Sequence, residues 1–122
     1  MSIPKNLDEC FIALDEMKIQ DCDNWLKKDE ESALGGAHFG LGMWLRNNWE
    51  LWSVSKTPFW KDTLPGYFHS IGIHHPDDMS GIILTSYHRY KNGKDINLDE
   101  QVKQYQTFWK NQDKRFKKPK KV

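Results

Sequence analysis

The stretch "HFGLGMWLRNNWELW", residues 38–52, decides the fold because it places apolar side chains around most of a helix. One helical face and its neighbouring stripe carry Leu41, Trp44, Leu45, Asn48 and Trp52, then Phe39, Met43 and Asn47. A helix that is apolar on most sides is buried on most sides. We therefore expect a buried helix over residues 32–52, with Trp44, Trp49 and Trp52 in the core.

Two features of this stretch need partners elsewhere in the fold. Gly40 and Gly42 each weaken a helix by about 1 kcal/mol relative to alanine, which indicates close approach of another backbone. Arg46 lies among tryptophans, so its charge needs an anion, and a carboxylate binds a guanidinium group bidentately. Asp77 and Asp78 form the adjacent acid pair of this half of the chain, and we predict that one of them pairs with Arg46.

Helix signals recur along the rest of the sequence, without sustained strand alternation. Further helices are expected over residues 7–18, 64–71 and 76–91, and from Leu98 onward. Residues 19–31 are expected to form a linker with one helical turn near Trp25, and residues 53–63 a loop. The predicted fold class is all-α: a compact bundle of four to five helices with no significant sheet.

Charge is distributed unevenly along the chain of 122 residues, although the formal net charge is only +1. Nine acids against four bases give residues 1–31 a charge of −5, and residues 32–113 sum to zero. Residues 114–122, "KRFKKPKKV", carry six bases and no acid. We expect one helical domain over residues 1–113 and a basic flexible tail over 114–122. Such a run is usually solvated, so attraction to nucleic acid or to a membrane is the less favoured interpretation.

Several classes of protein are disfavoured by the composition. The two cysteines, Cys10 and Cys22, make neither a disulfide framework nor a metal knuckle. The first twenty residues lack the apolar core of a signal peptide, and no apolar run approaches membrane-spanning length. A cytoplasmic protein that does not bind a membrane is therefore expected.

Two sequence blocks carry a resemblance to a known family. "HFGLGMWLRNNWELW" is followed by "GIHHPDDMSGIILTSYHRYKNGK", which contains an H-P-D-D-M-S block. The pair resembles a family of small, mainly bacterial proteins of unknown function that share both blocks. The resemblance covers about residues 38–95. It implies no established activity, and so it assigns no catalytic role to any residue.

The first candidate site is a polar cluster that joins the two blocks. Its members are His38, Arg46, Asn47, Asn48, Asp77, Asp78, Ser80 and His88. The structural interpretation is an Arg–Asp pair that ties two helices together, with the asparagines capping a neighbouring helix. The functional interpretation is a pocket in which Arg46 and His38 bind an anionic ligand or a partner residue. Both stay open, and the structural one is favoured.

The second candidate is a set of metal ligands. Its members are His69, His74, His75, Asp77, Asp78 and His88. Histidine and carboxylate can hold zinc, iron or manganese, but the sequence has no H-E-x-x-H and no facial-triad spacing. Ser80 lies in no G-x-S-x-G elbow, and no phosphate-binding glycine loop is present. We therefore expect no metal, no cofactor and no catalytic residue.

These exclusions favour a non-enzymatic binding protein of the cytosol. The most concrete version is an immunity- or antitoxin-like protein, whose acidic residues 1–31 would meet a protein partner such as a basic toxin or effector. One alternative is a small hydrolase-like enzyme that uses His38, Arg46 and Asp78 in a pocket. The other is a nucleic-acid adaptor that uses the basic tail.

Overall fold

Every regular element in the described part of the chain is a helix. The computed structural model describes residues 3–53 and 62–117, without the side chains of Phe39 and of residues 113–117. The elements in chain order are α1 (Leu7–Met17), α2 (Cys22–Lys27), α3 (Glu30–Ala37), the π-helical turn η1 (His38–Gly42), α4 (Met43–Asn48), α5 (Leu64–Ser70), α6 (Pro76–Lys91) and α7 (Leu98–Lys117). The predicted all-α class is confirmed for these residues, but the predicted number of four to five helices is too low. Most of the predicted loop over residues 53–63 lies outside the described residues.

The additional helices come from residues 19–31, which the sequence predicted to be a linker. Trp25 lies in α2 and donates its indole Nε1–H to the carbonyl oxygen of Ala33, at 2.9 Å. Asp29 caps α3 by accepting a hydrogen bond from the backbone nitrogen of Ser32, at 3.2 Å. Both helices are held by hydrogen bonds of single polar groups rather than by a repeated apolar face, so hydrophobic periodicity did not reveal them.

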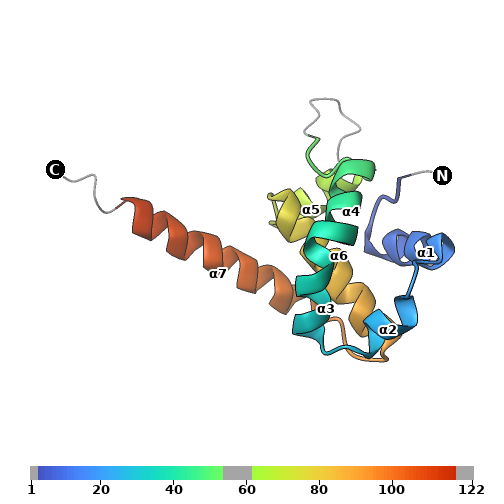
Figure 1. Cartoon of the computed structure of the whole chain (residues 1–122). Coiled ribbons are helices and arrows are strands. Elements are labelled where there is room, and N and C mark those ends of the chain that lie inside the picture. Colours follow the sequence, from blue (N-terminus) through green and yellow to red (C-terminus); the bar gives the residue numbers. More distant parts are fainter. Residues whose placement is uncertain (1–2, 54–61, 118–122) are drawn as a thin grey trace.

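Helix α6 lies at the centre of the fold, and α1, α3, η1, α4, α5 and α7 all pack against it (Figure 1). Pro76 begins the helix as predicted, because its fixed φ suits the first helical position and its missing N–H is not needed there. Gly93 follows the end of the helix with a left-handed φ of 69°. Met79, Ile82 and Ile83 are completely buried and form the middle of the core.

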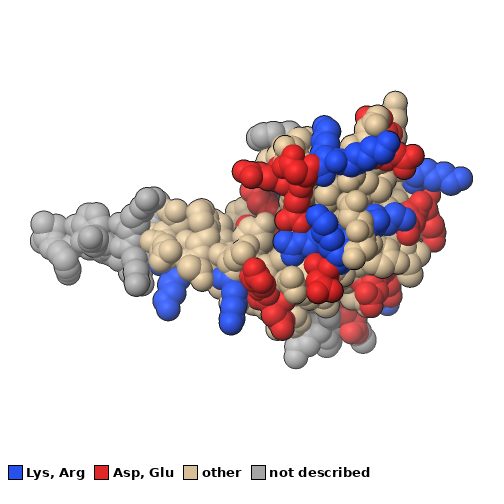
Figure 2. Space-filling view, turned by 90° about the horizontal axis from the view of Figure 1, so that it is seen from below, with Lys and Arg blue, Asp and Glu red and all other residues tan. Residues whose placement is uncertain are grey.

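Two of the acidic residues within 1–31 form ion pairs with bases of the same chain. Asp15 accepts a hydrogen bond from the Tyr87 hydroxyl at 2.7 Å and pairs with Lys91 at 3.1 Å. Glu30 binds Arg89 bidentately, with contacts of 2.7 and 3.0 Å. Both carboxylates therefore bind bases of α6 and hold α1 and α3 against it. Figure 2 shows acids and bases interspersed over one face of the body rather than separated into an acidic surface.

The stretch over residues 38–52 does not form one regular helix. α3 passes into η1 and then into α4, which ends at Asn48. A π turn bonds each N–H to the carbonyl five residues earlier, so it holds more residues per turn than an α-helix. Residues after Gly42 are therefore rotated away from the positions that an α-helical wheel assigns them. Glu50 then adopts a left-handed φ of 54°, and the Leu51 backbone nitrogen donates to the Arg46 carbonyl at 3.1 Å, which closes the helix end.

Of the three tryptophans that the sequence placed in the core, one is buried. Trp49 is 3% exposed, whereas Trp44 is 39% and Trp52 is 58% exposed. The rotation at η1 turns Trp44 and Met43 toward solvent, and Trp52 lies in the turn that follows α4. The prediction of a helix buried on most sides is therefore wrong for this face. The side chain of Phe39 lies outside the described residues.

Gly42 is the glycine of this stretch that a neighbour approaches closely. A Cβ built at Gly42 would lie 3.1 Å from Nη1 of Arg46 and 3.2 Å from the carbonyl oxygen of Ala37. Among the described residues, no atom lies within 4 Å of the corresponding position at Gly40. The predicted approach of another backbone is therefore wrong at Gly40, and at Gly42 the two nearest atoms belong to the same helical segment.

We expect Gly42→Ala to destabilise the protein, even though alanine favours a helix over glycine by about 1 kcal/mol. The added methyl group would press on Arg46 and on a backbone carbonyl that cannot move independently of the helix. Gly36→Ala in α3 is the matched control, because its Cβ would meet nothing within 4 Å. The control should gain about 0.5–1 kcal/mol in the free energy of unfolding, measured in urea. Equal stability of the two variants would contradict the tight packing at Gly42.

Helix α7 leaves the body and projects from it, so the predicted compact bundle does not include all of α7 (Figure 1). Its first turns are anchored, since buried Gln101 donates to the Ser86 hydroxyl at 3.1 Å. Farther along, Phe108 and Trp109 are exposed. The predicted tail over residues 114–122 overlaps the last turn of α7, and residues 118–122 lie outside the described residues. Within the described ranges no helix combines the length and apolar character needed to cross a bilayer.

Candidate functional site

Arg46 is buried and uses every nitrogen of its guanidinium group. Nε pairs with Oδ1 of Asp77 at 3.3 Å, Nη1 donates to Oγ of Ser80 at 2.9 Å, and Nη2 donates to the His38 carbonyl at 3.0 Å. The Ser80 hydroxyl in turn donates to the Asp77 carbonyl at 3.0 Å. The predicted Arg–Asp pair is confirmed, with Asp77 as the partner. We call these four residues the Arg46 network, and they fasten η1 and α4 to the start of α6.

The remaining members of the predicted polar cluster lie outside the Arg46 network. Asn47 and Asn48 are exposed, and Nδ2 of Asn48 donates to the carbonyl of Trp44 at 2.9 Å. Asp78 and His88 face other parts of the molecule. Consecutive residues of an α-helix are separated by about 100° around its axis, so Asp77 and Asp78 point in different directions. The eight residues therefore do not line one pocket, and the geometry supports the structural interpretation for those around Arg46.

His88 is completely enclosed in the core, with its ring edge-on to Trp25 at a centroid distance of 4.9 Å. Neither ring nitrogen of His88 has a hydrogen-bond partner among the described residues. The Trp25 indole N–H does not serve His88, because it donates to Ala33. A buried polar group without a partner bears a desolvation cost that nothing offsets.

We therefore expect His88→Leu to leave the stability unchanged or to raise it by about 1 kcal/mol, because an apolar side chain has no hydrogen bond to lose. Tyr87→Phe is the matched control on the same helix. It removes the hydroxyl that donates to Asp15 and should cost about 1–3 kcal/mol. Chemical denaturation of both variants measures the difference. A loss of several kcal/mol in His88→Leu would indicate that the ring nitrogens bind something essential.

The predicted metal ligands are dispersed. Nδ1 of His69 and Nδ1 of His74 lie 3.1 Å apart, and burial together with His74 lowers the pKa of His69. His75 caps α6 by accepting a hydrogen bond from the Asp77 backbone nitrogen at 3.1 Å. His88 lies apart from them, in the core beside α2. No group of three histidine, cysteine or acidic side chains that could hold a metal ion occurs among the described residues.

Neither cysteine lies where a reactive thiol is expected. Both are free, and Cys10 is buried. Burial, followed by the nearby charge of Glu9, raises the pKa of the Cys10 thiol far above its ordinary value. Burial is also the largest cause that raises the pKa of Cys22, ahead of the charge of Asp23. A thiol that stays protonated is a poor nucleophile, so these settings do not favour nucleophilic catalysis by either residue.

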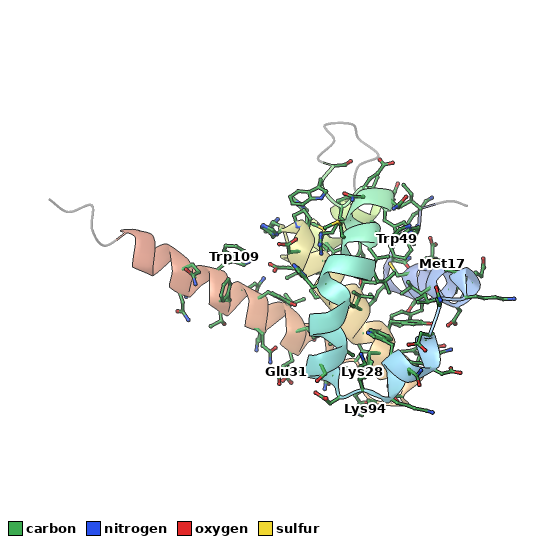
Figure 3. The ribbon with its side chains drawn as sticks, in the orientation of Figure 1. Met17, Lys28, Glu31, Trp49, Lys94 and Trp109 are labelled. Atoms are coloured by element: carbon green, nitrogen blue, oxygen red, sulfur yellow. The ribbon has the colours of Figure 1, made fainter. Side chains whose placement is uncertain are left out.

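A groove lies between α7 and the turn that leads into α6, and it was not predicted from the sequence as a pocket. His74, His75 and Asp78 of the second candidate set line it. Its volume is about 630 Å³. We call it the aromatic groove, and it is lined by Trp52, Gly72, Ile73, His74, His75, Pro76, Asp78, Tyr105, Gln106, Trp109 and Lys110. Figure 3 shows Trp109 on the projecting part of α7, on the far side of α4 from Trp49. The groove thus unites residues from three separate parts of the chain.

Aromatic rings run along this groove as a connected series. The rings of His75 and Trp109 stack with centroids 5.5 Å apart and an angle of 20° between their planes. Trp52 meets His75 edge-on at 6.1 Å. Trp52 and Trp109 are 58% and 42% exposed, so much of each indole faces solvent. The groove therefore offers aromatic surface to a ligand or partner.

Asp78 places a carboxylate within this aromatic surrounding. The residue is only 9% exposed, and its Oδ2 accepts a hydrogen bond from Nε1 of Trp109 at 2.7 Å. Burial raises the pKa of Asp78 above its ordinary value, and the Trp109 hydrogen bond opposes this shift. Of the eight cluster residues predicted from the sequence, Asp78 is the one that lines this groove.

Comparison with known proteins assigns the chain to a family. Residues 3–91 match the family described as Domain of unknown function (DUF6794). The chain belongs to the DUF6794 family. No curated protein and no solved structure matches it. The DUF6794 match ends at Lys91, the last residue of α6, and so it contains the whole Arg46 network.

The aromatic groove crosses the end of the DUF6794 match. Trp52, His75 and Asp78 lie inside the matched residues, whereas Tyr105 and Trp109 of α7 lie beyond them. Part of this groove was recognisable in the sequence. Trp109 follows Tyr105 at helical spacing, but nothing in the pattern indicated that α7 continues past the body. The 100° between Asp77 and Asp78 was a usable sign that the two acids serve different contacts.

Proposed function

We propose that this chain is a non-enzymatic protein that binds a protein partner through the aromatic groove. The observation that carries the proposal is the exposure of Trp52 and Trp109 beside a groove of about 630 Å³. Each indole carries a large apolar area, and leaving it in water forgoes the free energy of its burial. Tryptophan is also enriched among the residues that dominate the energetics of protein interfaces. Clustered exposed aromatic rings therefore support a partner-binding surface.

The projecting part of α7 adds to this support. Phe108 is exposed beside Trp109, with ring centroids 5.2 Å apart. Figure 2 shows a largely uncharged surface along this helix, with basic side chains on one edge. A helix that presents aromatic side chains beyond the body has a natural role in contacting another molecule.

The Arg46 network has a structural role in this proposal. Its guanidinium, hydroxyl and carboxylate groups bind one another and the His38 carbonyl, across η1, α4 and α6. A network whose groups are satisfied internally fixes one arrangement of the helices. The block over residues 38–52 thus holds Trp52 in position, and Trp52 rather than Arg46 contacts the partner.

Within this class, an immunity- or antitoxin-like protein of the bacterial cytoplasm that binds a basic toxin or effector is the most concrete version. The free thiols of Cys10 and Cys22 support a reducing compartment. The net charge of −5 on residues 1–31 favours a basic partner. Asp15 and Glu30 contribute little to that attraction, because they are paired with bases of α6.

Affinity capture from cells of the source organism tests the proposal, with the full chain as bait. The groove variant combines Trp52→Ala with Trp109→Ala. Trp44→Ala is the matched control, because Trp44 is about as exposed as Trp109 but does not line the groove. We expect a protein that the wild type and the control retain and that the groove variant retains at least about tenfold less. Equal retention by all three baits, or retention by none, would contradict the proposal.

A further inference from the structure

We propose that the aromatic groove receives a cationic side chain of the partner, with arginine as the best fit and Asp78 as its counter-ion. This inference rests on the proposed function, because it names the chemistry of the partner at the same groove. Three observations lead to it. The Oδ1 atom of buried Asp78 accepts no hydrogen bond from the described residues, none of their lysines or arginines pairs with it, and aromatic rings surround it.

The carboxylate of Asp78 accepts a hydrogen bond at one of its two oxygen atoms. Oδ2 accepts the hydrogen bond of Trp109, whereas Oδ1 accepts none from the described residues. An ionised carboxylate accepts several hydrogen bonds in water, and burial removes most of them. Burial of Asp78 to 9% exposure therefore leaves an acceptor at the groove that gains from a donor carrying positive charge.

No lysine or arginine among the described residues forms an ion pair with Asp78. Arg46 is bound to Asp77, on another side of α6. His75 caps α6 through Nδ1 and lies close enough to Asp78 to oppose the rise that burial causes in the pKa of its carboxyl group. Lys110 lines the groove, but it forms no ion pair with Asp78 in the described structure. Within the described residues, Oδ1 therefore has no lysine or arginine partner, and we assign that place to a cation of another molecule.

The surrounding rings suit a cation of planar shape. Trp52 and Trp109 flank His75, and indole faces attract cations more strongly than other aromatic rings do. A guanidinium group stacks on such a face while its edge donates to a carboxylate. An anion would meet the charge of Asp78, and a purely apolar group would bury that charge without compensation.

Amino-acid derivatives provide a direct test on the full chain. The probe is N-acetyl-arginine methylamide, and the matched probe is N-acetyl-citrulline methylamide, which has nearly the same shape but no charge. Each is titrated into protein with ¹⁵N-labelled tryptophan, and the indole N–H signals of Trp52 and Trp109 are followed by NMR. We expect the arginine probe to bind in the millimolar range, as a single side chain does, and the citrulline probe at least about tenfold more weakly.

Asp78→Asn is the decisive variant, because asparagine keeps an oxygen that accepts the Trp109 hydrogen bond and loses the charge. We expect it to fold with an unchanged or higher melting temperature and to bind both probes equally weakly. Trp52→Ala is a second variant whose side chain is mostly exposed, and it should also weaken arginine binding. Equal binding of the two probes by the wild type, or no binding of the arginine probe, would overturn the cation site.

The same variants separate this inference from the proposed function. If Asp78→Asn still captures the partner while Trp52→Ala/Trp109→Ala does not, the partner-binding groove stands and the cation site is overturned. If the arginine probe binds through Asp78 but no protein is captured, the cation site stands and the proposed function is contradicted.

Discussion

Arg46→Ala is expected to lower the free energy of unfolding by about 3 kcal/mol, the lower end of the range for breaking a buried ion pair from one side. The substitution removes the guanidinium donors of the buried Ser80 hydroxyl and of the part-buried His38 carbonyl. Asp77 is about half exposed and is partly resolvated, which keeps the loss from being larger. Urea unfolding measures the effect.

Arg46→Lys is the matched variant for this prediction, because it keeps the charge but not the planar fork. Lysine presents one ammonium group and cannot reach Asp77, Ser80 and the His38 carbonyl together in the geometry that Arg46 uses. We expect an intermediate stability. An Arg46→Ala protein that melts like the wild type but no longer binds the partner would show that Arg46 acts in binding rather than in folding.

Trp49→Ala is expected to cost about 3–5 kcal/mol, as large-to-small changes at buried aromatic positions do. Trp49 is 3% exposed and lies in the core between α4 and α1 (Figure 3). Its removal loses the transfer free energy of the indole and leaves a cavity that the surrounding helices close only in part.

Trp52→Ala is the control for this prediction, since it removes the same side chain three residues away. Trp52 is 58% exposed, so its loss should change the free energy of unfolding by about 0.5 kcal/mol. Thermal and chemical unfolding of the pair measure the contrast. Similar losses for the two variants would contradict the assignment of Trp49 to the core and Trp52 to the groove.

The parts of the fold that sequence reasoning predicted correctly depend on local chemistry. Helix α1 begins at Leu7 as predicted, with Asn6 accepting the Glu9 backbone N–H as its cap, and Pro76 begins α6 as predicted. The Arg46–Asp77 pair was predictable too, because a cation in an apolar helix needs an acid and the H-P-D-D block supplied one. Each of these predictions needed only the residue type and a neighbour close in sequence.

The errors arise where the backbone departs from a regular helix. Nothing in "HFGLG" distinguishes a π turn from an α turn, and one such turn changes which faces Met43 and Trp44 present. The left-handed Glu50 ends the helix at a residue type that does not usually mark an end. Both features displace Trp44 and Trp52 from the predicted core to the surface.

The aromatic groove was beyond prediction for a different reason. It needs the distance and angle between α7 and the turn before α6, which no periodicity encodes. Trp109 and Asp78 lie 31 residues apart in sequence, yet they share a hydrogen bond of 2.7 Å. A single sequence gives the composition of both elements but not the way in which one helix leaves the body.

Site-specific photo-crosslinking in cells of the source organism tests most directly that this groove, and not another surface, binds the partner. A benzoyl-phenylalanine residue replaces Trp52 in one strain and Ile12 in another, two side chains that are 58% and 59% exposed. We predict a discrete crosslinked protein from position 52 and none from position 12, which lies on α1. Crosslinks from position 12 alone, equal crosslinks from both positions, or none from position 52 would contradict the proposed function.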